Sequence, residues 1–209
     1  MSIPAGMEKP RPRAKAKGTG ERAGKDARLS KRAWQRAALE ALIADGIAGL
    51  TVPRLAATLG VTKGSFYWHF ESVADLLRAA LEDWERIFTD ERLAAFAREP
   101  DPRRRLAPWI AESGSSHPAQ RLHLAIASAA DDPVIAPVFA RVTEKRVAFL
   151  RAALVEIGLP KADAESRAVA AYAAYLGFLR LAESAPKVAG NARERARRAR
   201  AIFDALTRT

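Results

Sequence analysis

The chain has 209 residues and contains no cysteine. Without thiols it can form no disulfide framework, zinc knuckle or thiolate nucleophile, which excludes several classes of secreted protein and of enzyme. No stretch approaches the roughly 18 consecutive apolar residues that a membrane-spanning helix requires. The first ten residues also lack the apolar segment of a secretory signal. We therefore expect a globular protein of the cytoplasm that makes no contact with a membrane.

The residues from which catalytic and metal sites are built are also scarce. There are three histidines, His69, His117 and His123, and the last two are six residues apart, which is not the spacing of metal ligands on a helix. No P-loop, Gly-x-Ser-x-Gly elbow or distinctive carboxylate pair is present. The sequence thus predicts no enzyme, no metal site and no cofactor, and it leaves binding as the class of function.

Basic residues are abundant and unevenly placed. The chain has 35 Lys and Arg against 24 Asp and Glu, a formal net charge of +11 that favours a polyanionic partner. Residues 1–28 contain eight basic and three acidic side chains but no apolar period, so we expect a disordered basic tail. Two interpretations stay open: the tail contacts DNA phosphates in the minor groove, or it is a solvated segment that keeps the protein soluble.

After the tail, helix-breaking residues separate apolar stripes of helical period, and no convincing strand is present. We expect a first helix from Ser30 to Asp45, two short helices within residues 51–70, and a fourth from Val73 to about Ala97, on the order of 35 Å long. Further helices are expected at about 103–113, 118–130, 134–157, 162–184 and 192–207. The prediction is an all-α protein of about nine helices. Its parts are the tail 1–28, a helix-turn-helix domain 29–75 and a helical bundle domain 76–209.

Residues 51–70 have the pattern of two short helices joined by a tight turn. Thr51 and Thr62 are suitable N-caps, and Gly60 between them can take the left-handed conformation that ends a helix. Val61 can then enter the apolar corner between the helices. Such a corner is the core of a helix-turn-helix DNA-binding motif.

The second helix of this corner carries an unusual outward face. On a helical wheel Phe66 and Phe70 share one side, and the other side presents small residues followed by aromatic ones. A helix in the roughly 12 Å wide major groove can use such side chains against phosphates, thymine methyls and base edges. An alternative, a buried helix that is aromatic on all sides, fits poorly with its polar start. We expect contacts to base edges or adjacent phosphates from Thr62, Lys63, Ser65 and Trp68, close approach at Gly64, and backbone contacts from Thr51, Tyr67 and His69.

The segment from about Leu29 to Leu77 resembles the DNA-binding domain of the tetracycline-repressor (TetR) family of bacterial transcriptional regulators. One departure is Val73, where the family usually carries a lysine that meets a phosphate, so this chain lacks the side chain for that contact. The matching residues are Ala37-Ala38-Leu39, Gly46, Thr51-Val52, Leu55-Ala56, the run Gly60-Val61-Thr62-Lys63-Gly64-Ser65-Phe66-Tyr67-Trp68-His69-Phe70, and Asp75-Leu76-Leu77.

The resemblance implies a C-terminal domain with a pocket for a small effector and a dimer formed by the last two long helices. Small residues along 162–184 would allow close helix packing between two subunits, and the alternative is that they pack only within one. Aromatic residues with polar tips are typical of ligand pockets, although each is more often part of a core. The candidates for effector binding are Trp84, Phe88, Trp109, His123, Phe139, Tyr172 and Tyr175.

The sequence therefore predicts a homodimeric transcriptional regulator, in this family most often a repressor, that a small molecule releases from a palindromic operator in double-stranded DNA. Another hypothesis is a helical small-molecule-binding protein without specific operator recognition. A third, an enzyme on the same helical frame, would require turnover that survives deletion of residues 1–75.

Overall fold

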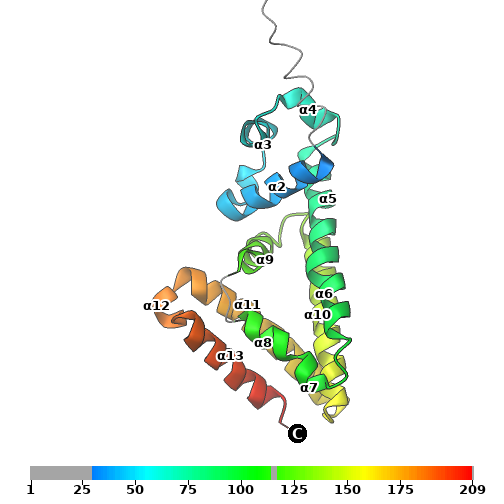
Figure 1. The fold of residues 1–209 in the computed structure, drawn as a ribbon, viewed down its shortest axis with the longest axis vertical. Helices are drawn as coiled ribbons and strands as arrows, with labels where there is room; N and C mark the ends of the chain where they lie inside the picture. Colours follow the sequence, from blue (N-terminus) through cyan, green and yellow to red (C-terminus); the bar gives the residue numbers. More distant parts are fainter. Residues whose placement is uncertain (1–29, 114–116, 209) are drawn as a thin grey trace, which may run out of the picture.

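A computed structural model describes residues 30–113 and 117–208, apart from the side chains of Ile110, Glu112 and Ser113. All its regular elements are helical, and the described residues contain no strand (Figure 1). The all-α prediction is thereby confirmed. The predicted basic tail, residues 1–28, lies outside the described residues.

The N-terminal helices form a small layer at one end of the elongated molecule (Figure 1). They are α2 (Lys31–Asp45), the 3-10 turn η1 (Ile47–Gly49), α3 (Val52–Leu59) and α4 (Lys63–Tyr67). Helix α2 buries Trp34, Ala37, Ala38 and Leu42, which repeat at helical spacing. Trp34 contacts Phe66 of α4 edge to face, at 5.3 Å between ring centroids, and this pair ties α4 to α2.

A long helix leads away from this end and is interrupted by one wide turn. It consists of α5 (Val73–Glu85), the π-helical segment η2 (Arg86–Asp90) and α6 (Glu91–Phe96). The side chain of Ser72 caps its start by accepting from the amide of Asp75 at 3.1 Å. The sequence predicted this helix to about Ala97 but not the π turn, which adds a residue to the helical repeat and is frequent at functional sites.

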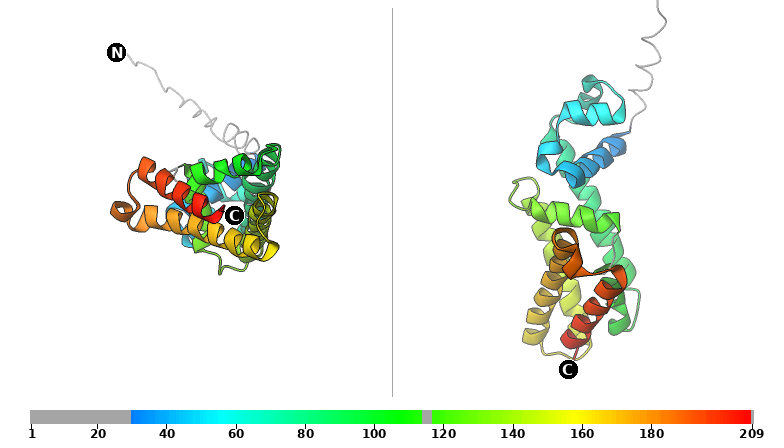
Figure 2. Two further views of the ribbon diagram at one scale, coloured as in Figure 1. Left: turned by 90° about the horizontal axis from the view of Figure 1, so that it is seen from below. Right: turned by 90° about the vertical axis from the view of Figure 1, so that its left-hand side faces the viewer.

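The remaining helices form a bundle at the other end (Figures 1 and 2). They are α7 (Pro102–Arg105), α8 (Ala107–Ser113), α9 (Pro118–Ser128), α10 (Ala136–Glu156), α11 (Lys161–Ser184), α12 (Pro186–Ala189) and α13 (Ala192–Leu206). Helices α10 and α11 pack along each other. The helix predicted at 103–113 is split at Leu106, and α12 occupies a segment that was expected to be a break.

Two groups of buried apolar residues stabilise the chain. One joins Trp34, Leu55 and Phe66 of the N-terminal helices to Leu81 of α5 and Val142 of α10. The other lies between α8, α10 and α11 and includes Trp109, Leu154 and Tyr175. Because the first group crosses residue 75, the N-terminal helices rest directly on the bundle. The predicted domain boundary between residues 75 and 76 stays a prediction.

Candidate DNA-binding surface and effector cavity

The corner between α3 and α4 is closed by backbone geometry. Gly60 has φ 67° and ψ 31°, the left-handed conformation that glycine adopts without a Cβ clash. The amides of Gly60 and Val61 then donate to the carbonyls of Ala57 and Ala56, at 3.1 and 3.0 Å. Two unsatisfied carbonyls of α3 are thus used, and the chain turns directly into α4.

Helix α4 separates buried from exposed aromatic residues. Phe66 and Phe70 are 0% and 2% exposed, with ring centroids 5.9 Å apart, whereas Tyr67 and Trp68 are 65% and 88% exposed. The helix was expected to continue to Phe70, but it ends at Tyr67, and Trp68 and His69 follow in a turn. This early end lets Trp68 point away from the body of the protein.

Six of the eight side chains or positions predicted to meet DNA lie on the exposed surface of this corner. His69 is half-buried. Ser65 is only 4% exposed, so the prediction that its side chain faces base edges is wrong. The helical wheel assumed a longer helix, whereas in the short α4 Ser65 lies next to Phe66 on the side that faces the core. The exposed positions are Thr51, Thr62, Lys63, Gly64, Tyr67 and Trp68.

The polar groups of the corner differ in availability. Thr51 stands at the N-cap of α3, yet its side chain makes no capping hydrogen bond. Arg54 is held in an ion pair with Asp45. Lys63 forms no ion pair within the described part of the chain. Thr51 and Lys63 can therefore meet a phosphate without first breaking an internal contact.

The residues predicted to bind an effector come together in the bundle. His123 of α9 lies 5.4 to 6.3 Å, between ring centroids, from Trp84, Phe139, Tyr172 and Tyr175. Trp109 packs edge to face on Tyr175 at 5.8 Å. Phe88 of η2 lines a small cavity together with Trp84, His123 and Tyr175. The arrangement joins residues of α5, η2, α8, α9, α10 and α11.

Burial controls the protonation of this cluster. It lowers the pKa of His123 well below its ordinary value, and the positive charge of Arg146 lowers that pKa further. His123 is therefore neutral at pH 7. Burial also raises the pKa of the Tyr172 and Tyr175 hydroxyls, which remain protonated.

Sequence reasoning missed the two charged residues that line the same cavity, Arg92 and Arg146. Arg146 is the more deeply buried of the two, at 6% exposed. A signal was present, because the buried stripe of α10 repeats every four residues and Arg146 interrupts it. The stripe is Val138, Val142, Arg146, Leu150 and Leu154.

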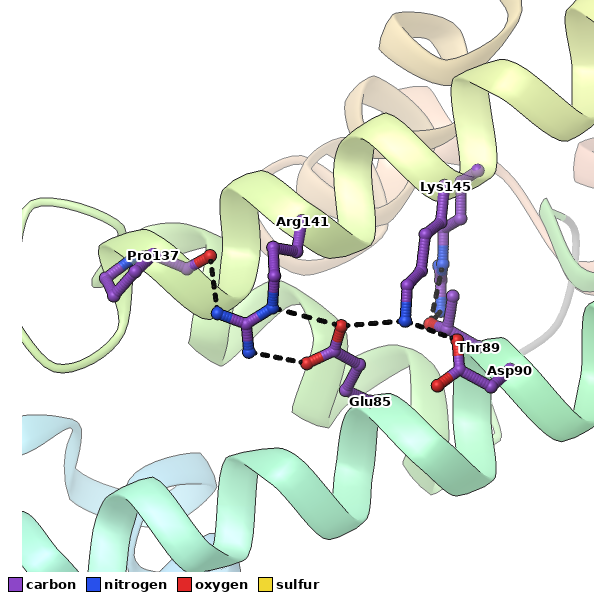
Figure 3. A network of polar contacts seen from close by, with 7 residues as sticks. Glu85, Thr89, Asp90, Pro137, Arg141 and Lys145 are labelled. Carbon is purple, nitrogen blue, oxygen red and sulfur yellow. Dashed lines mark hydrogen bonds and ion pairs between the residues drawn. The ribbon is translucent and has the colours of Figure 1, made fainter.

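An ion-pair network joins the long helix to α10 beside the cavity (Figure 3). Glu85, which is 7% exposed, accepts from Arg141 at 2.7 Å and lies 3.0 Å from the Lys145 ammonium. Lys145 also donates to Asp90 at 2.6 Å. Although burial alone would raise the pKa of Glu85, the hydrogen bonds and charges of the two cations lower it.

The described residues contain no helix long and apolar enough to cross a membrane. They also contain no group of three or more His, Cys, Asp or Glu side chains placed to hold a metal ion.

In comparison with known sequences, the N-terminal helices are the part of this chain that matches. Residues 36–80 match the family model described as bacterial regulatory proteins, tetR family. The HTH-type transcriptional regulator SrpR of Pseudomonas putida is 42% identical over 45 residues, which make up 22% of this chain and 21% of SrpR. The HTH-type transcriptional regulator TtgW, also of Pseudomonas putida, is 42% identical over 45 residues, which make up 34% of its length. The match therefore spans well under two thirds of either curated relative.

Solved structures resemble nearly the whole chain. A transcriptional regulator from Rhodococcus sp. Rha1 superposes with a TM-score of 0.71 and 22% identity, over 85% of this chain and 96% of its own. EbrR, a multidrug binding protein crystallised with malachite green, superposes with a TM-score of 0.63 and 23% identity, over 86% of this chain and 98% of its own. At such identities the likeness establishes the fold.

A helix-turn-helix corner at the end of a long helix, followed by a helical bundle, is the architecture of a class of DNA-binding regulators. The family model over residues 36–80 makes the assignment more specific. The helix-turn-helix segment of this chain is thus similar to the tetR family of bacterial regulatory proteins.

Proposed function

We propose that this protein is a homodimeric transcriptional regulator of the cytoplasm, a repressor that a small molecule releases from a palindromic operator. The observation that carries the proposal is the 88% exposure of Trp68 on a tetR-type corner whose other aromatic side chains, apart from Tyr67, are buried or half-buried. A large apolar side chain held out in this way is typical of a binding surface. No catalytic role is included, because the proteins that this chain resembles are described as bacterial regulatory proteins and an HTH-type transcriptional regulator.

The surface around Trp68 suits the DNA major groove. Lys63 supplies a charge for a phosphate, and Trp68 can contact thymine methyls or sugar through its ring. A Cβ added at Gly64 would meet only Thr62 Oγ1, at an ordinary 3.7 Å. Packing inside the chain therefore does not require glycine there, which favours a role in close approach to DNA.

Binding to the DNA upstream of its own gene tests this surface. In gel-shift titrations, Trp68→Ala should lose preference for that DNA over a scrambled duplex, because the ring contacts base edges. Lys63→Ala should weaken binding to both duplexes and lower the slope of log K against log salt by about one, since one phosphate contact is lost. Lys187→Ala, an exposed lysine of α12, is the matched control.

If both variants bind like the parent, the assigned surface is wrong. If the parent itself binds all duplexes alike with steep salt dependence while still binding a small molecule, the second hypothesis is favoured. That hypothesis is a helical ligand-binding protein without operator recognition.

The proposed dimer uses α11 with α10. One side of α11 exposes residues spaced three, four and seven apart, and they are small or apolar, including Val169 at 52% exposure. Val155 of α10 and Leu181 of α11 are also exposed, at 36% and 40%. Two such helix pairs can form a four-helix contact that sets two α4 helices about 34–36 Å apart, one turn of DNA. The exposed residues on the side of α11 are Ala162, Ser166, Val169, Ala170, Ala173 and Gly177.

The proposed effector site is the aromatic cluster around His123. Structural neighbours have been crystallised with small molecules, EbrR with malachite green and a regulator from Saccharomonospora viridis with choline. In this chain the cluster touches α5 and η2, so a ligand that changes its packing can act on the helix that carries the DNA-binding corner.

A further inference from the structure

Arg146 is a buried cation whose hydrogen-bond partners are all neutral. Its Nη2 donates to the Phe88 carbonyl at 2.9 Å and to Thr89 Oγ1 at 3.2 Å, and its Nε donates to the same hydroxyl at 3.3 Å. Its guanidinium also lies over the Trp109 ring, 5.7 Å from the centroid. These contacts orient the guanidinium and leave its charge uncompensated.

The neighbouring acids are engaged elsewhere. Glu85 lies one turn before Thr89 on the long helix and pairs with Arg141 and Lys145, whereas Asp90 directly follows Thr89 and pairs with Lys145 (Figure 3). Within the described part of the chain no carboxylate forms an ion pair with Arg146. A buried charge without a counter-charge is strongly unfavourable, which indicates that its partner comes from outside the chain.

Two further donors at the same place have no acceptor. Thr143 donates to the Tyr172 hydroxyl oxygen at 3.4 Å, and that hydroxyl lies 3.3 Å from His123 Nε2. In the tautomer in which the hydroxyl donates to Nε2, the neutral imidazole carries its proton on Nδ1. His123 Nδ1 and Trp84 Nε1 are both buried without a hydrogen-bond partner. With Arg146 they line one cavity. A water molecule could accept from the two donors but would bring no negative charge.

An apolar cavity lies next to this polar cavity, and Tyr175 lines both. The polar cavity has a volume of about 10 Å³, enough for about one water molecule. Tyr175 separates it from an apolar cavity of about 50 Å³ whose walls include Trp109 and Phe178. A ligand with a charged head and an apolar body would match the two cavities in order.

We propose that Arg146, His123 and Trp84 form the polar end of a binding site for a small carboxylate with an apolar body. This inference rests on the proposed function, because it assigns the chemical class of the effector. The carboxylate accepts from Arg146 and from the two unpartnered donors, and the body displaces Tyr175 toward the apolar cavity. In doing so the ligand competes for the guanidinium that holds the Phe88 carbonyl of the π turn, which links the site to the long helix.

Calorimetric titration of the DNA-free protein tests the proposal with three probes of similar shape: benzoate, benzamide and benzylamine. Benzoate should bind at least about tenfold more tightly than the neutral amide or the cation, because only the carboxylate offers charge-assisted hydrogen bonds. Arg146→Met should remove this preference, and Arg146→Lys should retain part of it. Arg151→Met is the matched control, since Arg151 is an exposed arginine of the same helix that pairs with Glu165 at 2.8 Å.

Equal binding of benzoate and benzamide to the parent protein, or no binding of benzoate, would overturn the proposal, and this comparison does not depend on any variant folding. Benzoate binding that survives in Arg146→Met would overturn it as well. Because no DNA is present, failure of operator recognition leaves the result unaffected, and the two proposals fail separately.

Discussion

At the scale of the residue, His123 is only 2% exposed, the lowest value among the titratable side chains that the structure describes. The groups that face it are the Arg146 guanidinium, the Tyr172 hydroxyl, and the rings of Trp84, Phe139 and Tyr175, and Arg92 lines the same cavity. Both tyrosines have raised pKa values and stay protonated at neutral and acidic pH. Only His123 in this cluster would therefore change its protonation between neutral and mildly acidic pH in the unfolded chain.

This predicts a pH-dependent stability. The unfolded chain binds a proton at His123 near pH 6.5, whereas the folded chain does not, so the folded state loses stability as pH falls below that value. Between about pH 6.5 and 5.5 the parent should lose about 1 kcal/mol more free energy of unfolding than His123→Gln. Urea unfolding at fixed protein concentration measures this difference. Equal losses in the two proteins would show that His123 is protonated in the folded state.

At the scale of the element, the network in Figure 3 fixes the long helix against α10. Glu85 is nearly buried and accepts from two cations, whereas Arg141 and Lys145 are partly exposed. Pairs on an open surface contribute little because water and salt screen them, but a largely buried carboxylate with two donors contributes more.

Glu85→Gln should therefore lower the free energy of unfolding at pH 7 by about 1–2 kcal/mol, since it removes the charge that Arg141 and Lys145 share. The lowered pKa of Glu85 means that this contribution is present at neutral pH and is lost as pH falls through the folded-state pKa. Glu40→Gln is the control, because Glu40 pairs with Arg36 at 3.8 Å and both side chains are exposed. If the two variants lose equal stability, the network does not fix the helix.

At the scale of the whole molecule, the long helix runs from the helix-turn-helix corner at one end of the molecule to the bundle at the other (Figure 2). Its residues Trp84, Phe88 and Arg92 line the polar cavity between these ends. For a ligand to change DNA affinity it must bind one arrangement of these parts more tightly than another. The π turn between α5 and α6 is suited to such a change, because its Phe88 carbonyl is bonded to Arg146 rather than only to the helix.

The proposed dimer can be tested by measuring the molar mass of the protein in solution. Ala173→Arg places a charge in the middle of the exposed side of α11 and should convert the dimer to a monomer in light scattering after size exclusion. Operator affinity should fall with it by at least about tenfold, because two linked corners bind two half-sites together. Ala201→Arg, at an exposed position of α13, should change neither. A dimer that persists in Ala173→Arg would place the interface elsewhere.

Much of the fold was predictable because its signals are local. Gly60, Ser72 and the paired prolines Pro100 and Pro102 end or begin helices through their own backbone and side-chain chemistry. The helical spacing of the corner likewise placed Phe66 and Phe70 on one side of the helix, and both are buried. For the same reason the exposure of Tyr67 and Trp68 followed from the sequence.

Other features depend on contacts between distant parts of the chain. The burial of Ser65 depends on where α4 ends, and the π turn is bonded through Phe88 and Thr89 to Arg146, more than 50 residues away on α10. The sequence alone determined an all-helical chain with an aromatic DNA-binding corner, because caps and periodicity act over a few residues. Only the tertiary structure brought Arg146 to His123 and Trp84, because a buried charge acquires its surroundings from helices that are far apart in sequence.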